Sequence, residues 1–150
     1  PTFGPLMNSA LNAATQLIVP VDSSYFALMG IKELLAEVEE IQRGTNPRLT
    51  VLGYLLTLVD PTNIASQTWD TLIANFGEAV FETKIKRSVK LREAPALGKT
   101  VFHHAPESTG ARDYLGLANE VMARLGIGEI AAGAGYARPT LSVVSGVAHE

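Results

Sequence analysis

Cysteine is absent from this 150-residue sequence, which excludes disulfide bonds and thiolate metal sites and fits a cytosolic protein. No uninterrupted apolar run reaches the roughly 18 residues that a membrane-spanning helix needs. The first residues lack the basic stretch and apolar core of a signal peptide. We therefore expect a cytoplasmic protein with no membrane partner. An excess of positive charge is also missing, because 12 Lys and Arg face 15 Asp and Glu. The composition as a whole gives no reason to expect nucleic-acid binding.

Familiar catalytic motifs are missing as well. The sequence contains no G-x-x-x-x-G-K-[ST] phosphate loop, no G-x-G-x-x-G, no H-E-x-x-H and no G-x-S-x-G. His103, His104 and Glu107 suggest a metal site, but adjacent histidines on an extended segment point to opposite sides. A solvated loop before a helix is the simpler interpretation. We predict no catalytic residue and no metal site.

The sequence begins "PTFGPLMNSALNAA", without an initiator Met and without a strand before this stretch. A domain normally begins with an element of its own. We therefore expect that the sequence starts inside a longer domain.

What the sequence does contain is a pattern of strands and amphipathic helices, with 47% hydrophobic residues for a core. Short apolar runs predict strands at 15–21, 49–60 and 79–85. Helical spacing predicts helices from Ser23 or Ser24 to about residue 43, at 64–76, near 91–97, and from Ser108 or Thr109 to residue 125. Strands that alternate with helices predict an α/β fold, with a partial parallel sheet and flanking helices.

Six of the 12 basic residues gather in "TKIKRSVKLREAPALGK", residues 83–99. Few carboxylates, Glu82 and Glu93, lie beside them in the sequence. One interpretation is a solvated loop whose charges serve solubility. The other is a strip that contacts polyphosphate or the DNA backbone without reading sequence. The residues alone leave both interpretations open.

Several segments together resemble a known family: "PTFGPLMNSALNAATQLIVPV", "SSYFALMGIKELL", "NPRLTVLGYLLTLVD", "FGEAVFETKIKRSVKLREAPALGKTV" and "ESTGARDYLGLANEVMARL". In this order and spacing, residues 1–125 resemble the C-terminal half of a ParA/Soj-type partition ATPase. That group of deviant P-loop ATPases also includes MinD-like proteins. Residues 126–150, rich in Gly and Ala, would form a poorly ordered tail.

The resemblance implies the C-terminal half of a doubly wound, P-loop NTPase-like fold. ATP and Mg²⁺ would be cofactors of the intact protein. In such proteins a P-loop, a catalytic aspartate region and a D-x-P-P motif precede the region in hand. Phosphoryl transfer needs the metal and the P-loop donors. We therefore expect this chain alone to bind no cofactor tightly and to be inactive as an ATPase.

The resemblance also assigns site residues. Thr57 and Asp60 match a T-x-x-D beside the nucleotide base. "IKR" replaces the family's I-P-R loop near the adenine, so the nucleotide-binding set is Thr57, Asp60, Ile85, Lys86 and Arg87. Lys90 stands where such proteins place a DNA-binding arginine, and the DNA-binding set is Lys84, Lys86, Arg87, Lys90 and Arg92. The switch segment at the dimer interface corresponds to Pro1, Thr2, Phe3 and Gly4.

Partners implied by the resemblance are a second copy of the protein, non-specific DNA of the nucleoid, a ParB-like centromere-binding protein and the missing N-terminal half. A stand-alone, non-enzymatic module that binds DNA or a partner is the alternative. A MinD-like membrane-positioning ATPase is least favoured, because Gly and Pro interrupt any amphipathic helix after residue 125.

Overall fold

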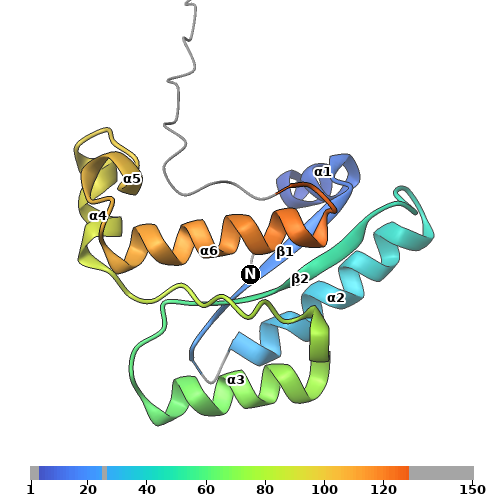
Figure 1. Ribbon diagram of the computed structural model, residues 1–150. Coiled ribbons are helices and arrows are strands. Elements are labelled where there is room, and N and C mark those ends of the chain that lie inside the picture. Colours follow the sequence, from blue (N-terminus) through green and yellow to red (C-terminus); the bar gives the residue numbers. More distant parts are fainter. Residues whose placement is uncertain (1–3, 25–26, 129–150) are drawn as a thin grey trace, which may run out of the picture.

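The computed structural model describes residues 4–24 and 27–128, shown in colour in Figure 1. A two-stranded parallel sheet forms its centre. Strand β1 (Gln16–Asp22) and strand β2 (Thr50–Thr57) are joined through helix α2 (Ala27–Arg43). The first two predicted strands and the parallel sheet are thereby confirmed. Of the predicted tail, residues 129–150 lie outside the described residues.

The third predicted strand, 79–85, is wrong as a continuous strand. After the 3-10 helix η1 (Gly77–Ala79), residues 80–87 run alongside β2 (Figure 1), but only two isolated bridges form, Tyr54 with Val80 and Val59 with Lys86. Tyr54 and Val59 are five positions apart, whereas their partners Val80 and Lys86 are six positions apart, so the partner segment must bulge. The backbone N–H groups of Glu82 and Thr83, in the bulge, donate to a side-chain carboxylate instead.

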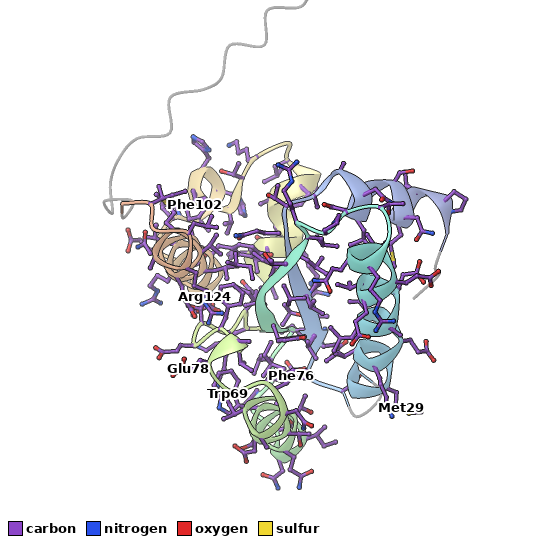
Figure 2. The ribbon with its side chains drawn as sticks, turned by 90° about the vertical axis from the view of Figure 1, so that its right-hand side faces the viewer. Met29, Trp69, Phe76, Glu78, Phe102 and Arg124 are labelled. Carbon is purple, nitrogen blue, oxygen red and sulfur yellow. The ribbon has the colours of Figure 1, made fainter. Side chains whose placement is uncertain are left out.

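Helices cover both faces of the sheet (Figure 2). On one face, α2 and α3 (Asn63–Phe76) bury a core that contains Val21, Ile31, Leu56 and Leu72. On the other face, α4 (Val89–Ala96) and α6 (Thr109–Arg124) pack on Leu55, Phe81 and Ile85 through partly buried residues of both helices. Alternating residues of β2 thus enter opposite cores, as a strand covered on both faces requires.

Helix α1 (Pro5–Ala13) and helix α5 (Val101–His104) are elements that the sequence interpretation missed. Pro at the first position of α1 suits a helix start, because proline lacks only an N–H that would be unpaired there. Buried Asn46 fixes the other end of α1, donating to the carbonyl oxygens of Leu11 at 2.9 Å and Ala14 at 2.7 Å. Helix α1 is therefore tied to the loop before β2.

Side-chain caps define the helices that follow the sheet. Thr62 accepts from the N–H of Ala65 at the start of α3. Ser108, one of the two predicted starts of α6, accepts from the N–H of Ala111. Ser23 was one of two predicted caps for α2, but its hydroxyl donates to the carbonyl oxygen of Leu58. Among the described residues, no helix is long and apolar enough to cross a bilayer.

Candidate functional site

The carboxyl ends of the strands bring most of the predicted nucleotide-binding residues together. We use "carboxyl edge" for Thr57, Asp60 and Ile85–Arg87. Arg87 Nε donates to both carboxylate oxygens of Asp60, at 3.1 and 2.9 Å, and the Arg87 N–H donates to the carbonyl of Val59. Ile85 is buried in the core, whereas Lys86 and Arg87 are exposed. The Thr57 hydroxyl turns toward β1 and donates to the carbonyl of Val21 at 3.3 Å.

Strand β2 ends at this edge because Leu58 adopts a left-handed backbone conformation, with φ of 53°. Such a conformation is strained for a residue with a Cβ and is found mostly where the surrounding structure enforces it. The hydroxyl of Ser23 holds the Leu58 carbonyl at 3.2 Å. On the other side, the Val59 N–H donates to the carbonyl of Ile85. Hydrogen bonds from both sides therefore hold the backbone between Thr57 and Asp60.

A pocket of about 320 Å³ opens beside Asp60, between the end of β2 and the first turns of α3. Trp69 and Lys84 are among its lining residues, with Lys84 Nζ 3.4 Å from the centroid of the Trp69 ring. Burial lowers the pKa of the Lys84 ammonium, and the nearby Asp70 opposes that shift. Lys84 therefore lies against an aromatic ring in a pocket, unlike the other predicted DNA-binding cations.

More carboxylates lie next to the remaining cations in the fold than next to them in the sequence. We use "basic strip" for Lys84, Lys86, Arg87, Lys90 and Arg92. Folding brings Asp60 to Arg87 at 2.9 Å and Asp113 to Lys86 at 3.8 Å, and both carboxylates come from distant parts of the sequence. Within α4, Lys90 Nζ lies 2.8 Å from Glu93 Oε2. Arg92 is exposed and forms no ion pair within residues 4–24 and 27–128.

Glu93 also joins α4 to α5. The oxygen that accepts from Lys90 lies 3.0 Å from His104 Nε2. Hydrogen bonds from Lys90 first, and then from His104, lower the pKa of the Glu93 carboxyl. His103 instead contacts the Thr100 hydroxyl through Nδ1. The part of the chain that the structure describes contains no group of three or more acidic, His or Cys side chains placed to hold a metal.

The sequence interpretation missed Glu120 and Arg124 of α6, which hold the backbone next to the basic strip. Glu120 on α6 accepts the N–H groups of Glu82 at 2.8 Å and Thr83 at 2.9 Å. Burial raises the pKa of this carboxyl, but hydrogen bonds from Thr83, Glu82 and Arg124 outweigh burial, and the net pKa is lowered. The spacing of Glu120 and Arg124, one helical turn apart, was the only signal available in the sequence.

Of the predicted switch segment, Pro1, Thr2 and Phe3 lie outside the described residues. Gly4 is half-buried and precedes α1 as its N-cap residue.

A family model described as an AAA domain matches residues 1–51. The chromosome-partitioning ATPase Soj of Thermus thermophilus is 51% identical over 126 residues, which are 83% of this chain and 51% of the relative. The sporulation initiation inhibitor protein Soj of Bacillus subtilis is 40% identical over 82% of the chain and 49% of its own length. The chain belongs to the Soj/ParA family. It spans about half the length of these relatives.

Solved structures extend the comparison to the fold of this Soj/ParA-family chain. Cobyrinic acid a,c-diamide synthase from Mycobacterium smegmatis matches with a TM-score of 0.58 and 26% identity, over 82% of this chain and 44% of that chain. A further structure of that synthase contains an ATP analog and magnesium, and matches with a TM-score of 0.59. The predicted α/β fold of this family is confirmed by these likenesses.

Proposed function

We propose that this chain is the C-terminal portion of a ParA-type partitioning ATPase that dimerises with ATP and binds DNA without sequence preference. Membership in the Soj/ParA family supports the partitioning role. The observation that carries the site proposal is the Asp60–Arg87 ion pair. Because Arg87 belongs to both the carboxyl edge and the basic strip, one side chain connects the proposed nucleotide site to the proposed DNA surface.

The carboxyl edge fits the base end of a nucleotide. Asp60 supplies carboxylate oxygens that accept from an amino group, and Lys86 and Arg87 supply exposed donors. Thr57 and buried Ile85 would shape the site from the strand side. These 150 residues contain no phosphate loop that could bind the phosphates of the nucleotide. When bound, Mg²⁺ would neutralise charge on the phosphates. Trp69, the single Trp of the chain, borders the pocket beside Asp60, so nucleotide binding by a protein that also carries a P-loop half should change its fluorescence.

Because these 150 residues contain no phosphate loop, the chain alone should be inactive as an ATPase, and turnover by the purified polypeptide would contradict this expectation. In the intact protein, residues 1–4 would contribute to a nucleotide-sensing switch at the dimer interface. A ParB-like centromere-binding protein would stimulate hydrolysis and release the protein from the nucleoid DNA.

The DNA proposal predicts a specific salt dependence. Replacing Arg87 and Lys90 together with Ala should weaken binding to a random-sequence duplex and reduce the slope of log affinity against log salt by roughly two, because each phosphate contact contributes about 0.9 to that slope. Fluorescence anisotropy at several salt concentrations measures both quantities. Lys32→Ala with Arg48→Ala is the matched control, since it removes the same charge at exposed positions outside the strip.

An unchanged slope in the Arg87 and Lys90 double variant, or an equal change in the control, would remove the DNA assignment. The result also bears on the alternative, a stand-alone DNA-binding module. Salt-dependent binding by this chain that needs neither nucleotide nor a second half would favour that module over the ATPase.

A further inference from the structure

Three cations of the basic strip already have carboxylate partners within the protein: Lys86, Arg87 and Lys90. A phosphate group that binds any of these cations must therefore displace or share a carboxylate. The three pairs differ in how readily that exchange can occur.

One of the carboxylates, Asp113, also holds the backbone. Asp113 is only 12% exposed and accepts the backbone N–H of Lys86 at 3.0 Å, which fixes it beneath the strip. Asp60 lies at the carboxyl edge and lines the pocket. Asp60 and Glu93 are similarly exposed, at 43% and 41% of their side chains, and within the described residues both carboxylates accept only from side chains, but Glu93 is also held by a second residue, His104. Lys90 is half exposed as well, so solvent and ligands reach both members of this pair.

The geometry points to Glu93 as an intramolecular competitor of the DNA backbone for Lys90. This inference rests on the proposed DNA binding and adds a residue that limits its strength. An exposed ion pair is weak, so a duplex with its dense row of phosphates can take Lys90 from Glu93.

His104 keeps that competitor in place. Its Nε2 contacts the same Glu93 oxygen that accepts from Lys90, and His104 is largely buried, with 18% of its side chain exposed. When Lys90 turns toward a phosphate, Glu93 remains held to α5 and cannot follow. The Glu93 carboxylate therefore stays within reach of Lys90 and can take it back from the phosphate. This competition keeps the contact between Lys90 and DNA reversible.

The test compares Glu93→Gln with Glu39→Gln in DNA-binding titrations at low salt. Glu39 is the matched control because it also forms an exposed ion pair, with Arg43 at 2.7 Å on α2, and its loss changes the net charge equally. Glu93→Gln should tighten binding by up to about fivefold more than Glu39→Gln, the upper limit that the loss of one exposed ion pair represents. In a Lys90→Ala background the additional gain should disappear.

Equal effects of the two Gln variants, or a gain that persists without Lys90, would overturn the inference. If Lys90→Ala and Arg87→Ala fail to weaken binding, the DNA assignment itself fails, and the inference fails with it. Should Glu93→Gln not fold, carbon NMR of the unsubstituted protein decides the question. The Glu93 carboxyl resonance should shift when DNA draws Lys90 away, and a resonance that DNA leaves unmoved would contradict the competition.

Discussion

Among single residues, Arg124 supplies hydrogen bonds to backbone carbonyl groups where a third strand would otherwise pair with β2. Its guanidinium donates to the carbonyl oxygens of Leu52 at 3.0 Å, Ala79 at 3.2 Å and Val80 at 2.8 Å, and it lies 4.0 Å above the Phe81 ring. The register between β1 and β2 skips Leu52. Arginine suits this position because its planar fork serves several acceptors at once. Figure 2 labels Arg124 on α6, beside the sheet.

Gly53 is the residue that makes room for this arrangement, and Gly53→Ala should destabilise the fold. An added Cβ would lie 2.6 Å from Arg124 Nη1, 2.7 Å from the Ala79 carbonyl oxygen and 2.7 Å from the Phe81 ring. Forcing an atom into such a site typically costs about 1–3 kcal/mol. Urea unfolding measures this loss. Gly116→Ala is the control, because its Cβ would meet Thr83 only at 3.5 Å or more, and Ala favours a helix over Gly. Equal stability of the Gly53 variant would contradict the close packing.

At the scale of elements, Glu120 connects α6 to the bulged segment and should make stability depend on pH. The folded pKa lies below the ordinary value of 4.5, so Glu120 stabilises the fold above pH 4.5, and that contribution is lost as the pH falls through the lowered folded pKa. Glu120→Gln leaves one N–H of the bulge without its acceptor and should cost about 1–3 kcal/mol at neutral pH. The difference from the unsubstituted protein should shrink in acid.

Urea unfolding at a series of pH values tests this prediction, with exposed Glu107→Gln as the control. A stability difference that stays constant from neutral pH into acid would show that the Glu120 charge has no part in holding the bulge.

The same segment shows where sequence patterns stop predicting structure. Short apolar runs predicted β1 and β2, and helical spacing predicted α3 and α6, because each of these elements carries its own local pattern. The third strand failed because its ladder is interrupted by acceptors from α6, which the local pattern does not contain. Helix α1 was missed because part of what fixes it, the Asn46 side chain, lies 32 residues or more away in the sequence.

Across the fold as a whole, the sequence could predict that the candidate residues come together at one edge, but it could not predict their charge balance. The resemblance placed Asp60 and Arg87 at one edge, and the structure joins them directly. The basic strip looked nearly free of carboxylates in the sequence. Asp60 and Asp113 each lie 27 residues from the cation that they neutralise, so only the fold brings them there.

The open edge of β1 should make the protein self-associate. Among the described residues β1 pairs only with β2, Ile18 is half-buried and Pro20 is exposed. Two paired strands are marginal on their own, and a free edge invites another strand. We expect the 16.0 kDa polypeptide to self-associate unless another segment or its other half covers this edge. Light scattering should show an average mass that rises with protein concentration. Ile18→Lys should lower that mass more than Ala74→Lys, which lies on the exposed face of α3. A compact, stable monomer whose β1 amides exchange freely with solvent would contradict this expectation, because an uncovered edge would then carry no cost.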